Sequence, residues 1–411
     1  MGSLRERNRL LVVDALRRRG LASRSDLARS TGLSRTTVGT VVAALQDQGL
    51  VVEQEVNGDR HTGRGRPPVL LRLDPAAGVA VGIYFDHDEV RVALADLSST
   101  VLGEDRTAID VDHSAADAID LAVEMVRSLQ RGAGVDGSHL VGAGVGLSGP
   151  IDRRTGKISS TAILPSWAGL QPQRELAERL ELRVEVDNDA NLGALAEASF
   201  GAGRGLRNIV YVTLGPGIGA GLVLDGRIHR GASGLAGEIG HVQVRPDGAV
   251  CRCGNRGCLE TIAGEGALEA LLRPRLGRDV SAGEMLDLVG RGDLGATRVV
   301  NDAGRAIGRV LADLCNALNP EAIIVGGQLS QAGKPLLGGI RESVDRYALP
   351  AAGQGVRVLL GELGERAEVI GALALVIANT DSLSSRALPA FARAGAQGSV
   401  TRREEVRAGS T

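Results

Sequence analysis

Three of the four cysteines in this 411-residue chain stand close together, and a histidine precedes them. His241, Cys251, Cys253 and Cys258 supply one imidazole and three thiolates, which are typical ligands of tetrahedral zinc. Because protein side chains fill all four positions, none is left for a substrate, and we expect a structural Zn²⁺ ion. The alternative is a loop whose four residues bind nothing.

Acidic and amide side chains flank this cysteine-rich stretch. Glu238 stands just before the histidine, and Glu260 follows the last cysteine. Upstream, the sequence VEVDNDANLGALAE places Asn188 and Asp189 where a predicted strand enters a helix. Groups of this kind suit a polyhydroxylated ligand, because each hydroxyl both donates and accepts hydrogen bonds. Taken singly, each acid also fits an ordinary solvated surface position.

A glycine-rich stretch, TLGPGIGAG at 213–221, separates two apolar runs. The pattern predicts a turn between two strands, and backbone N–H groups of such turns can bind a phosphate. Pro216 stands inside this turn and has no N–H to donate. The stretch therefore raises the question of whether the protein binds ATP.

From about residue 78 onward, apolar strands alternate with amphipathic helices, which predicts an α/β body. The first set contains predicted strands at 78–85, 90–97 and 139–149 and a helix at 115–130. A comparable second set contains strands at 207–214, 219–226, 321–327 and 356–363 and a helix at 294–318. Two α/β lobes with a cleft between them account for this repetition. Cys315, alone in the long helix, is expected to be a buried core thiol.

The first residues predict a DNA-binding unit of three helices, at 5–19, 24–32 and 35–49, with Ser23 capping the second. The tight turn at 32–34 makes the last two helices a helix-turn-helix. In such units the start of the last helix meets base edges in the major groove. The candidate contacts are Ser34, Arg35, Thr36, Thr37 and Thr40.

The segment that follows, residues 49–75, predicts a two-stranded wing whose hairpin turn is Asn57-Gly58. Within it, GRGRP at 63–67 offers Arg64 and Arg66 to a narrow minor groove. The alternative is a flexible basic loop.

Charge is unevenly distributed along the chain. Residues 1–73 carry 13 arginines against seven acidic residues, whereas the whole chain has a net charge of −2. A basic N-terminal segment on an acidic body favours nucleic-acid contact at the N-terminus alone. The chain contains neither a long uncharged apolar stretch nor a signal peptide pattern, so we expect a cytoplasmic protein without membrane contact. Composition predicts a disordered tail at 385–411.

Several motifs together resemble those of the ROK family (repressors, open reading frames and sugar kinases). They are GRGRP after a winged helix, LSGPID at 147–152, LPSW at 164–167, DNDAN at 187–191, GEIGH at 237–241 and CRCGNRGCLE at 251–260. The resemblance implies an actin-like (ribonuclease H-like), two-lobed sugar-kinase fold. We therefore expect a winged helix-turn-helix domain at 1–74 and a body at 75–384 whose zinc loop is 241–258.

The resemblance also implies a sugar site and a test for kinase activity. The implied sugar-binding residues are Gly149, Asn188, Asp189, Glu238, His241 and Glu260. In family kinases the residue matching Asp189 is the general base, and two glycine-rich turns hold the phosphates. Here Tyr84 stands where the first turn should begin with aspartate, the residues after it lack glycine, and Gly-Thr-Gly-Ile-Gly has become Gly-Pro-Gly-Ile-Gly in the second turn.

We therefore expect no catalytic residue, with Asp189 serving only as a sugar ligand, because phosphoryl transfer depends on positioning the phosphates. The expected function is a sugar-responsive transcriptional regulator, a repressor, that binds a palindromic double-stranded DNA operator and a sugar or sugar-phosphate effector. A homodimer or a dimer of dimers is expected. One alternative is a bifunctional ATP-dependent sugar kinase with a DNA-binding domain. Another is a zinc-stabilised DNA-binding protein controlled by a protein partner.

Overall fold

The computed structural model describes residues 4–54, 69–152, 156–158 and 163–378. The expected Asn57-Gly58 turn, Arg64, Arg66 and the tail 385–411 lie outside the described residues.

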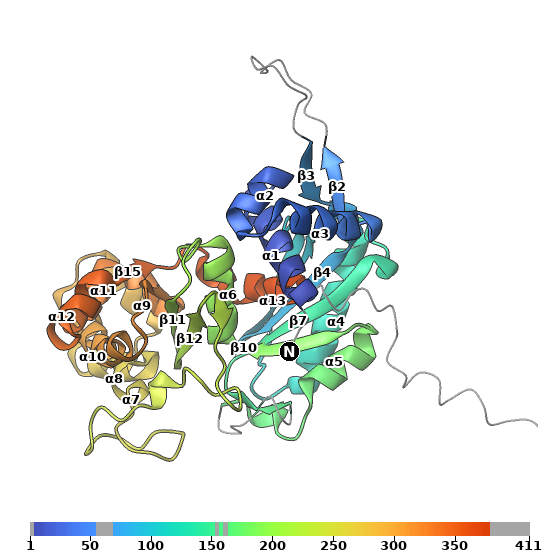
Figure 1. Ribbon diagram of the computed structural model, residues 1–411. Helices are drawn as coiled ribbons and strands as arrows, with labels where there is room; N and C mark the ends of the chain where they lie inside the picture. Colours follow the sequence, from blue (N-terminus) through green and yellow to red (C-terminus); the bar gives the residue numbers. More distant parts are fainter. Residues whose placement is uncertain (1–3, 55–68, 153–155, 159–162, 379–411) are drawn as a thin grey trace, which may run out of the picture.

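At the N-terminus, three helices and a small sheet form a winged helix-turn-helix unit (Figure 1). Its elements are α1 (Leu4–Arg19), α2 (Arg24–Thr31), α3 (Arg35–Asp47), β1 (Ala22–Ser23), β2 (Val51–Gln54) and β3 (Leu70–Leu73). As expected, Ser23 caps α2: its side chain accepts the backbone N–H of Asp26, whose carboxylate accepts the N–H of Ser23. Leu16, Leu27 and Val42 lie in the core of the unit.

Two details differ from the sequence prediction. The helices expected to end at residues 32 and 49 end at Thr31 and Asp47, because Gly32 and Gly49 adopt left-handed backbone with φ of 70°. The expected two-stranded wing is a three-stranded sheet, in which β1 pairs antiparallel with β3. A strand of two residues has no periodicity by which sequence could reveal it.

The body contains two five-stranded sheets with the same connectivity, ordered β10-β7-β4-β5-β6 and β15-β14-β11-β12-β13. In each, the central strand pairs antiparallel with the next strand of the chain and parallel with a later one. The first sheet has β4 (Val79–Phe85), β5 (Glu89–Asp96), β6 (Val101–Ala108), β7 (Leu140–Leu147) and β10 (Val184–Asn188). The second has β11 (Ile209–Leu214), β12 (Ile218–Leu224), β13 (Arg227–Ile228), β14 (Ala322–Gly326) and β15 (Arg357–Leu360).

Helices cover both faces of each sheet, which confirms the predicted two-lobed α/β architecture. The first sheet lies between α4 (Ala115–Ala133) and α13 (Ala367–Ala378), and the second lies between α10 (Leu294–Leu318) and α6 (Asp189–Phe200). The remaining helices are α5 (Pro172–Leu180), α7 (Glu260–Ala263), α8 (Glu265–Leu276), α9 (Ala282–Gly290), α11 (Lys334–Tyr347) and α12 (Pro350–Gly355). A small hairpin pairs β8 (Ile151–Asp152) with β9 (Lys157–Ile158). Cys315 is fully buried in the α10 core, as expected.

Helices α6 and α13 pack against each other between the two sheets (Figure 1). The approach is close: a Cβ at Gly371 of α13 would lie 2.1 Å from the carbonyl oxygen of Leu192 in α6. A Cβ at Gly144 of β7 would lie 1.9 Å from the carbonyl oxygen of Ala372. Only glycine fits at both positions: Gly371 permits the contact between the lobes, and Gly144 lets α13 pack closely on its own sheet.

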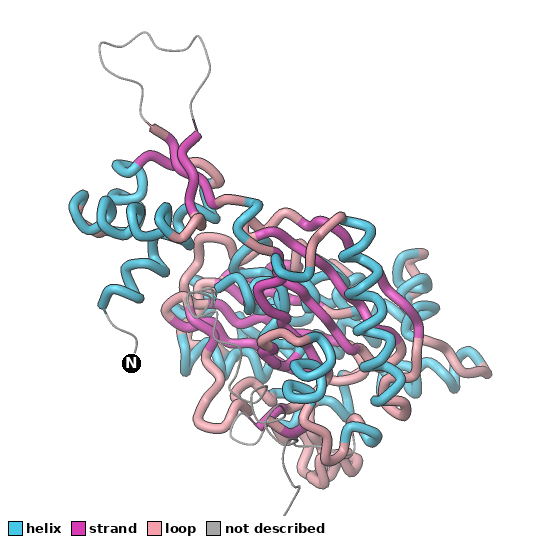
Figure 2. The backbone as a smooth tube through the Cα atoms, turned by 90° about the vertical axis from the view of Figure 1, so that its right-hand side faces the viewer, coloured by secondary structure: helices cyan, strands magenta, loops and turns pink. Residues whose placement is uncertain are grey.

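The winged helix unit stands at one end of the body (Figure 2). Leu50, just before β2, packs on a cluster formed by β4, β5 and α13, which includes Val369 and Leu373. Helix α13 therefore contacts the opposite lobe and also contributes to the cluster on which the DNA-binding unit packs. No helix in the described part of the chain combines the length and apolar character needed to cross a membrane.

Candidate functional site

A cavity of about 520 Å³ lies between the two lobes and is lined from both. All of the residues expected to bind a sugar contribute to its wall: Gly149, Asn188, Asp189, Glu238, His241 and Glu260. They come from the loop after β7, the start of α6, the segment before the cysteine-rich loop and the start of α7. The structure thus brings together residues that are more than 100 positions apart in the sequence.

The start of α6 is fixed by a buried polar network. The side-chain oxygen of Asn188 caps the helix by accepting the N–H of Asn191, which leaves its amide donors free to serve a ligand. Asp187 accepts the backbone N–H of Asn188 and the side-chain amide of Asn191, and Arg230 donates to it at 2.6 Å. The first residues of DNDAN therefore orient Asn188 and Asp189 toward the cavity.

The carboxyl groups of the cavity raise one another's pKa values. Burial, followed by the charge of Asp86, raises the pKa of Asp189 to about 6. Burial, followed by the charges of Asp189 and Glu260, raises the pKa of Glu238 to about 7. Both groups are therefore close to the point where they exchange between donating and accepting hydrogen bonds near neutral pH.

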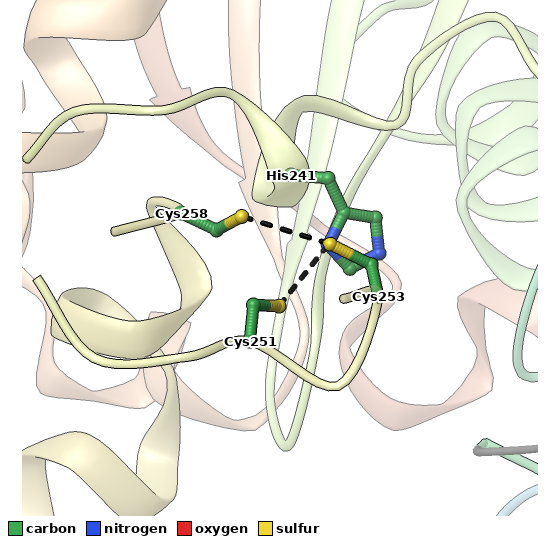
Figure 3. Close-up of side chains that lie close together, drawn as sticks. All are labelled: His241, Cys251, Cys253 and Cys258. Atoms are coloured by element: carbon green, nitrogen blue, oxygen red, sulfur yellow. Dashed lines mark hydrogen bonds between the residues drawn. The ribbon is translucent and has the colours of Figure 1, made fainter. Parts of the chain in front are cut away.

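The four residues expected to bind metal converge, and their side chains point toward one another (Figure 3). Their ligand atoms lie within 4.8 Å of one another. Cys253 Sγ is 3.7 Å from Cys258 Sγ, and Cys251 Sγ is 3.6 Å from His241 Nδ1. A tetrahedral zinc ion with Zn–S bonds of about 2.3 Å separates two thiolates by about 3.8 Å. The donor set and its spacing therefore fit a zinc ion.

His241 faces two sites at once. Its Nδ1 points into the sulfur cluster, and its Nε2 lies 4.0 Å from the Glu238 carboxylate in the cavity. A metal held by Nδ1 leaves a proton on Nε2, which then faces the cavity as a donor. The cysteine-rich loop is thus joined directly to the wall of the cavity.

Glu260 is held by an arginine that the sequence analysis did not single out. Arg252, between two of the cysteines, donates to both carboxylate oxygens of Glu260, at 2.7 and 2.9 Å. The guanidinium also lies over the glycine-rich turn, because a Cβ at Gly217 would be 2.9 Å from its Nη2. The expected sugar ligand Glu260 is therefore already one partner of a bidentate ion pair.

The first turn that would hold phosphate in a kinase is the turn between β4 and β5. It consists of Asp86, His87 and Asp88, and His87 Nδ1 is 2.8 Å from Asp112. Burial raises the pKa of Asp86. Two carboxylates in this turn oppose a bound phosphate, since like charges at short range repel.

The second turn, residues 215–217, joins β11 to β12 as predicted. The carboxylate of Glu265, the first residue of α8, lies beside it: a Cβ at Gly215 would be 3.6 Å from its Oε1. Burial and the charges of Glu269 and Asp86 raise the pKa of Glu265 to about 7.

Two more residues line the cavity that were not predicted to do so. Glu368, near the start of α13, is buried and accepts a hydrogen bond from the Tyr211 hydroxyl at 3.3 Å. Tyr84 lies 3.2 Å from Ser148, hydroxyl to hydroxyl. The position of Tyr84 in the kinase motif could have indicated that it lines the cleft. Glu368 is a single glutamate in the apolar sequence of α13, and no sequence pattern indicated its place.

The expected DNA-contacting residues gather at the exposed start of α3. Arg35, Thr36 and Thr40 are exposed. Ser34 caps the helix, with its Oγ accepting the N–H of Thr37 and lying 2.8 Å from the hydroxyl of that residue. The hydroxyls of these two residues therefore stabilise the helix start, while the other three side chains are open to a partner.

Comparison with known proteins gives two family matches. The ROK family matches residues 80–379, and the MarR family matches residues 6–60. The xylose repressor of Bacillus spizizenii is 30% identical over 370 residues, which cover 90% of this chain and 94% of the relative.

Some relatives are enzymes. The glucokinase of Halalkalibacterium halodurans is 40% identical over 250 residues, which cover 57% of this chain and 75% of the kinase. Among solved structures, a ROK family transcriptional regulator described as a homologue of the Escherichia coli MLC protein superimposes with a TM-score of 0.75 at 26% identity. The match covers 92% of this chain and 98% of that one.

Proposed function

The chain belongs to the ROK family, and we propose that it is a sugar-responsive DNA-binding transcriptional regulator of the repressor type. The observation that carries this proposal is the joining, in one chain, of a winged helix-turn-helix unit and a cleft with convergent amide and carboxyl groups. The likeness to a xylose repressor along nearly the whole chain supports it. The fold of the body alone would not support the proposal, because sugar kinases have the same fold.

The proposed sugar ligands are the amide of Asn188, the carboxyl groups of Asp189, Glu238 and Glu260, His241 and the Gly149 loop. Their donors and acceptors suit the hydroxyls of a sugar. The proposed DNA contacts are Ser34, Arg35, Thr36, Thr37 and Thr40 in the major groove and Arg64 and Arg66 in the minor groove. Ser34 and Thr37 would contact DNA while also capping α3.

We further propose that two copies bind a palindromic operator. A dimer of bodies would set two recognition helices about 34 Å apart, one turn of DNA. A sugar that binds one arrangement of the lobes more tightly than the other would change that spacing and release the operator.

We propose that His241, Cys251, Cys253 and Cys258 hold a structural zinc ion. When bound, zinc supplies a rigid tetrahedral anchor and no open coordination position. His241 and Glu260 are then held in place from the metal side, because His241 is itself a ligand and Glu260 follows the ligand Cys258 by two residues.

Selection of genomic DNA fragments by the purified protein tests the proposal. We expect recovery of a palindromic sequence beside genes of sugar uptake or breakdown, and release of that DNA by the matching sugar. DNA binding that no sugar alters would favour the other regulator, a zinc-stabilised protein controlled by a protein partner.

A sugar kinase that also binds DNA is the second candidate, favoured by the 40% identity to a glucokinase. Against it stand the carboxylates of Asp86 and Asp88 in one turn, and Pro216 and the Glu265 carboxylate at the other. We propose that kinase activity has been lost. Incubation with ATP, magnesium and a panel of hexoses should give no sugar-dependent ADP, and clear turnover would overturn this part of the proposal.

A further inference from the structure

The cleft holds a large excess of acidic groups. Nine carboxylate and three guanidinium side chains line it. Each guanidinium is within ion-pair distance of a carboxylate: Arg91 pairs with Glu89 and Glu365, Arg106 pairs with Glu365, and Arg252 pairs with Glu260. The wall, in the part of the chain that the structure describes, therefore offers a phosphate group no cation that lacks a carboxylate partner.

The acids extend beyond the residues expected to bind a sugar. Asp86 raises the pKa of Asp189 on one side and the pKa of Glu265 on the other. Asp86 therefore lies within electrostatic range of both groups. Asp189, the β4–β5 turn and Glu265 at the start of α8 all line this one cleft.

Glu265 has a carboxylate oxygen with no partner. The residue is only 8% exposed, it lines the cavity, and its buried Oε1 takes part in no hydrogen bond. An acceptor buried without a donor is costly, and native proteins rarely leave one so. We therefore look for a hydrogen-bond donor for this oxygen on a bound ligand.

Resting on the proposed function, we infer that the end of the cleft around Glu265 is a second sugar subsite, and that the effector is an unphosphorylated glycoside of at least two sugar residues. One residue binds at Asn188 and Asp189, and the next donates a hydroxyl to Glu265. Hydroxyls satisfy acidic acceptors, whereas a phosphate on either residue would face the carboxylates of Asp86 and Glu265.

Titration calorimetry on the full-length protein, with its zinc content verified, tests this inference. The probes are xylose and xylobiose, glucose and cellobiose, and glucose 6-phosphate. At least one disaccharide should bind at least tenfold more tightly than its monosaccharide. Glucose 6-phosphate should bind at least tenfold more weakly than glucose.

The variant Glu265→Ala should lower the disaccharide affinity at least tenfold and remove most of the advantage over the monosaccharide. Glu124→Ala, at an exposed position of α4 outside the cavity, is the matched control and should leave both affinities unchanged. Should Glu265→Ala misfold, as judged by its melting transition, Gln328→Ala is the second variant: Gln328 is an exposed residue that lines the same cavity, and its replacement should lower the same ratio.

Equal affinity for mono- and disaccharides, or a preference for glucose 6-phosphate, would overturn the second subsite while leaving a sugar-responsive regulator intact. If none of the probes binds, and none releases a selected operator, the proposed function falls together with the subsite.

Discussion

Asp189 is buried among other carboxyl groups, and these surroundings decide what it can do for a sugar. Its pKa of about 6 leaves it mainly ionised at pH 7.5, where it accepts a hydroxyl hydrogen bond strongly. A general base needs the same position, so the residue alone does not separate a kinase from a sensor. The phosphate turns separate them.

Replacing Asp189 by Asn should lower sugar affinity at pH 7.5 by tenfold or more, because hydrogen bonds to charged groups contribute about 1.5–3 kcal/mol. Operator affinity without sugar should not change, since Asp189 lies in the cleft and not on the winged helix unit. Calorimetry and a DNA binding assay measure the two quantities. Asp117→Asn on the exposed face of α4 is the control. An unchanged sugar affinity would remove Asp189 from the ligand set.

Glu368 makes the free energy of unfolding depend on pH, and its raised pKa determines the sign of that dependence. Burial, followed by the charges of Asp189 and Asp86, raises its pKa from 4.5 to about 8. Between these values the folded protein keeps a proton that the unfolded chain has released. The contribution of this group to the free energy of unfolding therefore decreases as pH rises from about 4.5 to about 8.

Glu368→Gln should remove this pH-dependent penalty and still accept the Tyr211 hydroxyl. Because one pKa unit corresponds to about 1.4 kcal/mol, a shift from 4.5 to about 8 predicts a gain on the order of 4 kcal/mol at pH 8, which falls below about 1 kcal/mol near pH 5. Urea unfolding at both pH values measures it. Glu362→Gln, an exposed position before α13, should show no such difference. A variant less stable than the parent at pH 8 would contradict the assignment.

The cysteine-rich loop is the element most dependent on a bound ion. Cys253→Ser should lower the zinc content and the sugar affinity together, because His241 is a ligand of the ion and Glu260 follows the loop by two residues. The winged helix unit has its own core and should keep its helices. Metal analysis measures the zinc content, calorimetry measures the sugar affinity, and circular dichroism measures the helix content. Cys315→Ala in α10 is the control and should retain zinc. A Cys253→Ser protein with normal sugar affinity would make the metal irrelevant to the cleft.

Helices α6 and α13 pack against each other where the two lobes meet. Gly371→Ala should destabilise the protein by about 1–3 kcal/mol, because the added Cβ meets the backbone carbonyl of Leu192, which cannot move aside as a side chain would. Gly132→Ala in α4, where the added Cβ meets nothing within 4 Å, should be neutral or slightly stabilising. Equal melting temperatures for both variants would show that the interface tolerates an added Cβ.

At the scale of elements, the sequence allowed prediction of the features that leave a periodic pattern or a characteristic residue spacing. The bounds of α10 were predicted residue for residue, since its apolar face repeats over seven turns and Asp293 caps its start. The metal cluster followed from the spacing of four residues. Glu265 and Glu368 could not be predicted as wall residues, because what brings them to the cleft is the packing of α8 and α13, not any local pattern. Arg252 was missed although it stands between two expected ligands.

Over the whole molecule, α13 contributes to the cleft, to the contact with the opposite lobe and to the cluster on which the DNA-binding unit packs. Glu368 near its start lines the cavity, Gly371 contacts α6, and Leu373 belongs to the cluster against which Leu50 packs. A change in lobe arrangement that moved α13 would therefore also move part of the cluster on which the winged helix unit packs. Spatial continuity alone does not establish coupling, which has to be measured as a free energy shared by two ligands.

Such coupling has a strict consequence, because the sugar and the operator must weaken each other by the same factor. If a disaccharide lowers operator affinity, we expect a factor of about 5 to 150, and operator DNA must lower disaccharide affinity equally. Calorimetry with and without saturating operator duplex measures one direction, and a DNA binding assay with and without sugar measures the other. A duplex of scrambled sequence is the control. If sugar affinity is the same on free and operator-bound protein, that sugar is not the effector, however tightly it binds the cleft.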